Sequence, residues 1–249
     1  MIAIRLAQAQ HSLQKILALV YPPRCLSCGG LVENDFGLCP SCWRETPFSG
    51  GLTCDACAKP LPGQSDQIEY CDDCMTEPPP WTKGCAALIY EGVGRKLVLG
   101  LKHGDRFDIA GPAAKWMAQH AIQMHIDAPL ICPVPLHPLR HIRRRFNQAA
   151  LLSKALASEL GADHCVDALQ RTVHTQNLDG KTRTERFEQL HGAISVKPDN
   201  NHLIKDRNIL IVDDVMTSGA TLSACSEALR QVGAAEIYVC VMARVAPPT

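Results

Sequence analysis

The sequence predicts an α/β protein in which a small cysteine-rich module precedes a parallel sheet covered by helices on both faces. Two observations carry this prediction. Eight of the thirteen cysteines form four C-x-x-C pairs between residues 25 and 74. From Trp81 onward, short apolar runs typical of strands alternate with stretches of helical periodicity. Because domains usually have roughly 100 to 200 residues, we expect two units in this chain, residues 1–80 and 81–249.

Charge and hydropathy narrow the function classes. Lys plus Arg and Asp plus Glu number 25 each, so no global field draws the protein to nucleic acid or to an anionic membrane, and any basic site must be local. The apolar run ILALVY is too short for a secretory signal or a membrane span. We therefore expect a cytoplasmic protein, in which clustered cysteines bind metal more often than they form disulfides.

The first twenty residues have the pattern of an amphipathic helix, because their apolar side chains fall within an arc of about 100° on a helical wheel. The polar face is mostly glutamine rather than Lys or Arg. This composition favours packing against the body of the protein over binding to a membrane surface. The apolar positions are Ile2, Leu6, Leu13, Ile16, Leu17 and Val20.

The four C-x-x-C pairs predict two structural zinc sites. Two thiolates three residues apart reach one tetrahedral ion, and a second pair closes the site. The intervals between the pairs are similar in the two halves, which favours a duplicated zinc-ribbon-like module. One alternative is a cross-braced arrangement, in which the first and third pairs share an ion. Another is that the cysteines are redox-active. Residues 21–80 contain few apolar side chains, so metal must replace a core. The predicted ligands are Cys25, Cys28, Cys39, Cys42, Cys54, Cys57, Cys71 and Cys74.

The other five cysteines stand singly among apolar neighbours and are interpreted as small buried hydrophobic residues. They are Cys85, Cys132, Cys165, Cys225 and Cys240.

The second unit contains four predicted strands and three predicted helices. The strands are CAALIY, LICPVP, DRNILIVDD and AEIYVCVMARV, and the helices cover residues 110–125, 147–160 and 219–231. Alternation of this kind is typical of a parallel sheet with helices on both faces, in which ligands bind at the carboxyl ends of the strands.

The stretch ILIVDDVMTSGATL, residues 209–222, predicts a binding site at such a strand end. Asp213 and Asp214 close the strand, and the next loop leads into a helix whose N-terminus can receive a phosphate. Two carboxylates beside an anion site would repel the anion unless they face another part of the ligand. A phosphorylated sugar fits, because its vicinal hydroxyls would donate to the aspartates. The phosphate would contact Thr217, Ser218, Gly219, Ala220 and Thr221.

This stretch resembles the phosphoribosyl pyrophosphate (PRPP) motif of type I phosphoribosyltransferases. With the cysteine cluster and the segments CPVPLHPLRHIRRRFNQAALLSKALA from 132 and QRTVHTQNLDGKTRTER from 170, the whole chain resembles the ComF/GntX family of competence and DNA-utilisation proteins. The resemblance implies a type I phosphoribosyltransferase-like sheet that binds Mg²⁺ and PRPP at 213–221. It also implies a pyrophosphate-side loop near 135–147, a flexible lid near 171–190, and a setting in the handling of imported single-stranded DNA.

Transfer from PRPP proceeds through an oxocarbenium-like state as pyrophosphate leaves, so the chemistry depends on cations around the leaving group. Lys102, with His103 and Asp105, matches a family motif and is expected in the same cleft, and Lys181, Arg183 and Arg186 lie in the proposed lid. We predict that Asp213, Asp214, Lys102 and Arg183 form the catalytic set. The predicted contacts to pyrophosphate or to DNA are His137, Arg140, Arg143, Arg144 and Arg145.

Two departures from the family pattern bear on function. Arg145 stands where family members usually have glycine in Arg-Gly-Phe-Asn, so the turn must form differently. Thr217 stands where hypoxanthine-guanine transferases have an acidic residue, which argues against a 6-oxopurine acceptor.

Three function classes follow. We favour a DNA-processing accessory protein with a PRPP site, whose partners are PRPP, weakly bound single-stranded DNA and other DNA-uptake or recombination proteins. A metal module fused to a transferase-like domain suits partner recruitment. The alternatives are a nucleobase-salvage phosphoribosyltransferase and a zinc-stabilised DNA-binding or interaction adaptor without catalysis. Aromatic residues make up only 5% of the chain, which weakens any claim of strong base stacking on single strands.

Overall fold

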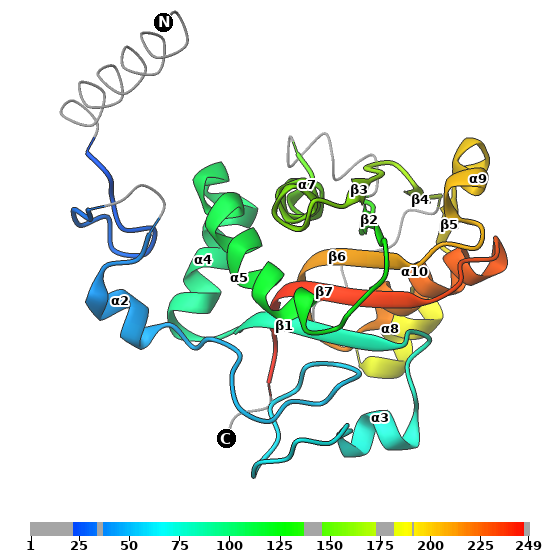
Figure 1. Ribbon diagram of the computed structural model, residues 1–249, viewed down its shortest axis with the longest axis horizontal. Coiled ribbons are helices and arrows are strands. Elements are labelled where there is room, and N and C mark those ends of the chain that lie inside the picture. The colour runs from blue at the N-terminus through cyan, green and yellow to red at the C-terminus, as the bar shows by residue number, and fades with distance from the viewer. Residues whose placement is uncertain (1–21, 34–36, 137–145, 173–181, 191, 247–249) are drawn as a thin grey trace, which may run out of the picture.

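The second unit is built on a five-stranded parallel sheet, shown in the computed structural model of Figure 1. The structure describes residues 22–33, 37–136, 146–172, 182–190 and 192–246, so the predicted N-terminal amphipathic helix lies outside the described residues. The strand order is β1-β7-β6-β2-β3, and all neighbours run parallel. The strands are β1 (Lys83–Ile89), β2 (Leu130–Pro133), β3 (Asp163–His164), β6 (Ile209–Met216) and β7 (Ile237–Arg244).

Helices cover one face of this sheet. Side chains alternate between faces along a strand, so Leu210 and Val212 of β6 point to this side, where they form one buried cluster with the helices. The covering helices are α4 (Gly92–His103), α5 (Ala110–Ile122) and α7 (Gln148–Leu160), preceded in the case of α5 by the short helix η1 (Phe107–Ile109).

The opposite face is covered by three different kinds of structure. Ile209 and Ile211 of β6 point to this side and pack in a second buried cluster. The first covering element is helix α10 (Ala220–Gln231). The second is an antiparallel strand pair, β4 (Leu169–Arg171) with β5 (Ile194–Val196), and the helices that adjoin it, α8 (Arg183–Leu190), η2 (Pro198–Asn200) and α9 (Asn201–Ile204). The third covering element is the C-terminal half of the cysteine-rich module.

That half-module packs into the same core as the sheet. Cys54, Ala56 and Trp81 are all buried in the cluster that includes the β6 and β7 side chains. The approach is close enough that Gly84 of β1 leaves no room for a side chain, since a Cβ there would lie 2.4 Å from the Ala56 carbonyl oxygen. The cysteine-rich module contains the short helices α2 (Pro40–Glu45) and α3 (Asp72–Thr76).

The predicted fold class is confirmed, while a boundary at residue 80 stays a prediction. The predicted strand DRNILIVDD ends at Asp214, but the strand in the structure continues to Met216, because β7 pairs with it as far as Arg244. On its other side the pairing with β2 stops at Val212. Asp213 and Asp214 therefore lie inside β6 but beyond the end of β2, where the sheet edge opens. Among the described residues, no helix has the length and apolar content needed to cross a lipid bilayer.

Candidate functional site

The two aspartates of β6 occupy different environments at this opened edge. Asp214 is buried, with 8% of its surface exposed, and its Oδ1 lies 3.1 Å from the Nζ of Lys102, the second-to-last residue of α4. Asp213 is half-buried, and its Oδ1 accepts a hydrogen bond of 2.8 Å from the Asp214 N–H. The structure thus brings Lys102 to the aspartates, whereas His103 and Asp105 are exposed to solvent.

The pKa of Asp213 is raised to about 7, first by burial and then by the adjacent Asp214 carboxylate, against the opposing effects of Lys102 and the buried Arg171. Asp213 therefore exchanges its proton at a pH near neutral. A site of this kind can accept hydrogen bonds from hydroxyl groups or a divalent cation, and it can release a proton as the ligand enters.

The turn after β6 presents a helix N-terminus without a side-chain cap. Gly219 is the N-cap of α10, adopts φ 82°, and makes no side-chain capping bond. The first intrahelical bond runs from Ser223 N to Gly219 O at 2.9 Å, so helix geometry leaves the N–H groups of residues 220–222 without intrahelical acceptors. A long contact of 3.5 Å from Ala220 N to Ser218 Oγ competes for one of them. This end of α10 is therefore suited to an anion.

Helix α7 holds the backbone of Lys102 in place. Gln148 is 1% exposed and donates from Nε2 to the Lys102 carbonyl oxygen at 3.3 Å. Asn147 caps α7, since its Oδ1 accepts from Ala149 N at 3.0 Å, and its Nδ2 donates to Val134 O just beyond β2. Asn147 thus joins the end of β2 to the start of α7, although the preceding loop, in which Arg145 replaces glycine, lies outside the described residues.

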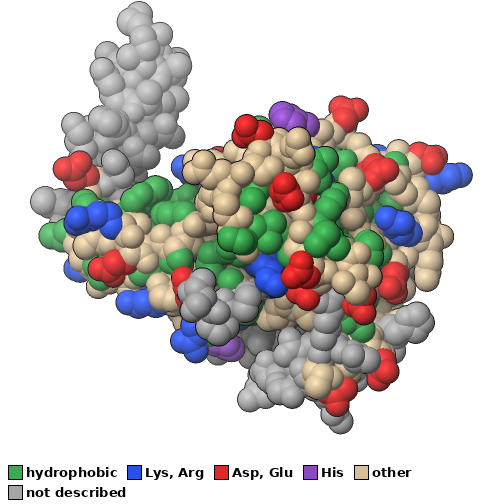
Figure 2. Space-filling view, turned by 90° about the horizontal axis from the view of Figure 1, so that it is seen from below, with side chains coloured by type: hydrophobic (Ala, Val, Ile, Leu, Met, Phe, Trp, Pro, Cys, Tyr) green, Lys and Arg blue, Asp and Glu red, His purple; other side chains and the backbone are tan. Residues whose placement is uncertain are grey.

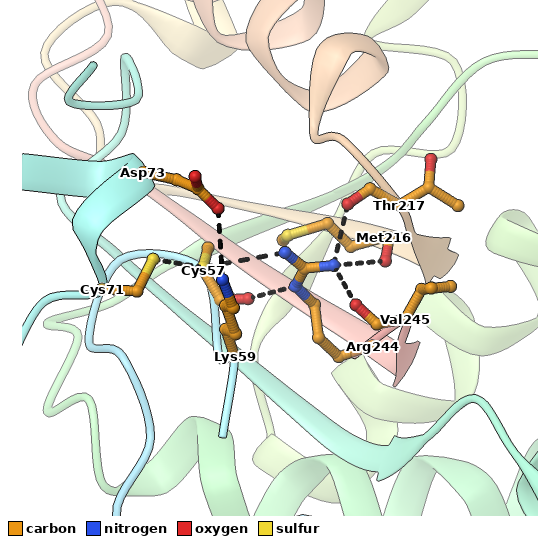
Figure 3. Close-up of polar contacts among 8 residues, drawn as sticks. All are labelled: Cys57, Lys59, Cys71, Asp73, Met216, Thr217, Arg244 and Val245. Atoms are coloured by element: carbon orange, nitrogen blue, oxygen red, sulfur yellow. Dashed lines mark hydrogen bonds and ion pairs between the residues drawn. The ribbon is translucent and has the colours of Figure 1, made fainter. Parts of the chain in front are cut away.

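A buried arginine connects this turn to the cysteine-rich module. Arg244, the last residue of β7, is 9% exposed and lies between the β6 turn and Cys57, as Figure 3 shows. Its Nη1 donates to the carbonyl oxygens of Met216, at 3.1 Å, and Thr217, at 2.8 Å, and also to Val245 O. Its Nε donates to Cys57 O at 2.8 Å, and Nη2 lies 3.8 Å from Cys57 Sγ.

Trp81 makes a second connection between the same two regions. Its Nε1 donates to Ala56 O at 2.6 Å, between the first two cysteines of the second half-module. Its ring also closes off Gly219, because a Cβ at that position would lie 3.1 Å from Cη2 of Trp81. Glycine at 219 is therefore required both by its positive φ and by this ring.

The cysteines gather into two sets of four in chain order. Within each set the Sγ atoms lie within 4.8 Å of one another. Four thiolates bound about 2.3 Å from one tetrahedral zinc ion lie about 3.8 Å apart, and the Cys28–Cys39 and Cys57–Cys71 Sγ distances are both 3.7 Å. The predicted pair of four-cysteine zinc-binding sites is confirmed, and the cross-braced alternative is wrong. The sets are Cys25, Cys28, Cys39 and Cys42, then Cys54, Cys57, Cys71 and Cys74.

Each set contains a thiol whose pKa is lowered by hydrogen bonding. The Cys57 side chain lowers the pKa of Cys54 to about 4, and the Ser41 hydroxyl lowers the pKa of Cys39 to about 6, whereas burial raises the pKa of Cys42 and of Cys74 to about 12. Thiolates are the form that binds zinc. The five single cysteines are buried, as predicted.

The predicted cationic residues are only partly placed. His137, Arg140 and the arginines at 143–145 lie outside the described residues, as do Lys181 and the side chains of Arg183 and Arg186. On the face seen in Figure 2, acidic and basic side chains of the described residues are interspersed, with no large patch of one sign. Sequence reasoning missed Arg171, Trp81 and Arg244. The available signal for Arg244 was a lone charge at the end of an apolar strand, where a buried cation needs partners.

The site and fold together define a phosphoribosyltransferase-type domain joined to a double zinc ribbon. The family profile described as "Double zinc ribbon domain" matches residues 16–75, and that described as "Phosphoribosyl transferase domain" matches residues 147–247. Competence protein F of Haemophilus influenzae is 30% identical over 230 residues, which cover 89% of this chain and 96% of the relative. The chain belongs to this competence protein F family, ComF/GntX.

Two further relatives are informative. DNA utilization protein YhgH of Escherichia coli K12 is 28% identical over 232 residues, covering 91% of this chain and 99% of the relative. Adenine phosphoribosyltransferase of Mycobacterium marinum is 29% identical over 89 residues, covering 35% of this chain and 46% of that protein. A solved glutamine PRPP amidotransferase from B. subtilis aligns at 14% identity and a TM-score of 0.38 over 57% of this chain and 30% of its own, too low a likeness to carry weight.

Proposed function

We propose that the chain binds PRPP with Mg²⁺ at the opened edge of the sheet and acts as an accessory protein in the handling of imported single-stranded DNA. One observation carries the first half: the N-terminus of α10, which has no side-chain cap, follows in the chain soon after two carboxylates, of which Asp214 pairs with Lys102. The helix N-terminus can bind an anion, and the aspartates can bind hydroxyl groups or a cation. The two groups are joined by one short connection between β6 and α10. PRPP combines those two chemistries in one ligand.

Each described residue has a distinct task in this proposal. The N–H groups of 220–222 and the hydroxyls of Ser218 and Thr221 bind the 5-phosphate. Asp213 and Asp214 accept from the ribose hydroxyls, which orients the anomeric carbon. Lys102 shifts from Asp214 towards the departing pyrophosphate, whose negative charge develops at that edge.

The oxygen ligands also fit Mg²⁺, which is commonly bound by one or two carboxylates together with substrate phosphates. Asp213 and Asp214 would hold the ion, directly or through water, on the pyrophosphate side. Bound Mg²⁺ neutralises charge on the pyrophosphate leaving group. The half-buried Asp213, whose pKa is raised to about 7, carries a proton near neutral pH and would release it when a cation binds.

Calorimetric titration of variants tests the site. Asp214→Asn should weaken Mg²⁺-dependent PRPP binding by about 1.5 to 3 kcal/mol, the scale of a hydrogen bond to a charged group. Thr221→Trp should abolish binding by filling the phosphate end. Asp163→Asn is the matched control, since it also removes a carboxylate that pairs with a cation, Arg207. Asp163 lies in β3 beside Leu130, at the end of β2 away from the proposed site. Equal PRPP affinity in Asp214→Asn and Asp163→Asn would exclude the proposed site.

The DNA setting is supported by the names of the full-length relatives, a competence protein and DNA utilization proteins. The arginine cluster at 140–145 remains the proposed contact to the nucleic-acid backbone, in competition with PRPP. Such contacts give weak, sequence-independent affinity that falls with salt. A screen of nucleobases and single-stranded nucleic acids for PRPP-dependent pyrophosphate release would identify any acceptor.

A nucleobase-salvage phosphoribosyltransferase is a second candidate, favoured by the similarity to adenine phosphoribosyltransferase. Thr217 argues against a 6-oxopurine acceptor, so adenine is the base to test first. Pyrophosphate release with adenine and not with DNA would support this alternative. No PRPP binding to the folded protein would instead favour the adaptor class.

A further inference from the structure

We propose that Arg244 transmits the occupancy of the second zinc site to the phosphate-binding turn, so that zinc at Cys54, Cys57, Cys71 and Cys74 is required for the order of residues 217–219. Arg244 is then a positioning residue. This coupling concerns the turn itself, and only its consequence for PRPP rests on the proposed function.

The first step is the charge balance around Arg244. The guanidinium is buried, and among the described residues it takes part in no ion pair with a carboxylate. Its partners are four carbonyl oxygens and the Cys57 sulfur. A buried cation is stable only if a negative charge compensates it. Zinc bound by four thiolates carries two negative charges in excess, so the loaded second site supplies that charge.

The second step is mechanical. One end of the planar guanidinium holds the carbonyls of Met216 and Thr217, while the other end holds Cys57 through its carbonyl and sulfur (Figure 3). The fork is rigid, so both ends must be positioned together. When zinc leaves, the four sulfurs are no longer held at one centre, so Cys57 no longer fixes its end of the fork. The two carbonyls that start the turn then lose a donor held in position.

Trp81 provides a second contact through which the zinc site can affect the turn. Its indole is fixed by Ala56, which lies within the Cys54–Cys57 knuckle, and its ring lies against Gly219. Loss of the metal-held knuckle therefore releases the turn at two points. The first zinc set has different neighbours: Leu26, next to Cys25, packs in the buried cluster on the other face of the sheet.

Amide hydrogen exchange of residues 216–222 tests the coupling, with matched pairs of variants in the full-length zinc-loaded protein. Cys74→Ser and Cys39→Ser each remove one half-buried ligand, the former from the second set and the latter from the first. Exchange should be at least about tenfold faster than wild type in Cys74→Ser and within about twofold in Cys39→Ser, because local opening controls exchange. Equal exchange in the two variants would overturn the proposal.

A second pair of variants distinguishes the role of Arg244 from that of Lys59, the other cation near the second zinc set. Arg244→Met should accelerate exchange at 216–222 as Cys74→Ser does. Lys59→Met should not, because the Lys59 ammonium pairs with Asp73, at 3.3 Å, whereas the carbonyls of Met216 and Thr217 accept from Arg244. Unchanged exchange in Arg244→Met refutes the proposal.

Exchange of the buried β7 segment 239–242 shows whether each variant is folded. If Arg244→Met loses protection there, Arg244→Lys replaces it: the charge beside Cys57 is kept and the fork is lost. Faster exchange at 216–222 with zinc retained then supports the proposal, and wild-type exchange overturns it. Coupling between sites is reciprocal for binding free energies, so PRPP should also raise the zinc affinity of the second site, measured in equilibrium competition with a chromophoric chelator. If PRPP does not bind at all, that arm fails while the exchange result stands.

Discussion

Replacing Asp213 with Asn should make the protein more stable at alkaline pH, with an effect that disappears at acidic pH. The folded protein raises the pKa of Asp213 from 3.8 to about 7, chiefly by burial and then by repulsion from Asp214. Because the folded state holds this proton more tightly than the unfolded state, stability falls as pH rises from about 4 to about 7 and is constant above that. Asn does not titrate, and its Oδ1 can still accept from the Asp214 N–H.

The size of the effect follows from the shift of about three pKa units, worth at most about 4 kcal/mol. Solvent reaches the half-buried carboxylate and screens part of this interaction energy, so we expect Asp213→Asn to be more stable than wild type by about 1 to 3 kcal/mol at pH 8. Urea unfolding of wild type and Asp213→Asn between pH 4.5 and 8.5 measures this difference in unfolding free energy. A difference in unfolding free energy that is the same across this range would refute the assignment of a raised pKa to Asp213.

The remaining predictions concern the other parts of the site. Metal analysis should find about two zinc ions per chain, and Cys39→Ser should lose one ion while the circular dichroism of the sheet domain is retained; a wild-type value near one would contradict the two-site account. Lys102→Met should lower the unfolding free energy by about 1 to 3 kcal/mol in a denaturant titration, because Asp214 loses the cation that compensates its buried charge; no loss would show the pair to be incidental. Alanine at Arg143, Arg144 and Arg145 should reduce anisotropy-measured binding to a labelled oligonucleotide and flatten its salt dependence, and wild-type DNA affinity would assign this cluster elsewhere.

Periodicity and spacing predicted most of the architecture. The four predicted strands and three predicted helices of the second unit all exist, because each has enough apolar residues in one pattern to decide its own conformation. Cysteine spacing was equally informative, since metal geometry permits few arrangements. The aspartates and Gly219 were identifiable because a strand, a turn and a helix follow one another within the short stretch 209–222.

The elements that sequence reasoning missed depend on tertiary contacts. Helix α4 contains Gly92, Gly94 and Gly100, which lower helix propensity. Two of these glycines are explained by neighbours, since a Cβ on Gly94 would lie 2.4 Å from Ile89 O and one on Gly100 would lie 3.2 Å from the Ile109 side chain. Strands β3, β4 and β5 have only two or three residues each, too few for a periodic pattern.

The role of Arg244 was also beyond the sequence. Its partners Cys57 and Met216 are 187 and 28 residues away, and nothing in the local sequence indicates that they meet. The packing of the second zinc half onto β1 and β7 creates this contact. A pattern of cysteines predicts the metal site but not the surface on which it lies.

An NMR titration of the zinc-loaded protein with PRPP and Mg²⁺ tests the central claim most directly, because it reports on the individual amides of the turn. If the α10 N-terminus binds the 5-phosphate, the amide signals of residues 218–222 should shift progressively and saturate, while the amide of Asp163 at the opposite end of the sheet stays in place. Saturable shifts confined to other regions, or no shifts at PRPP concentrations in the millimolar range, would contradict the account.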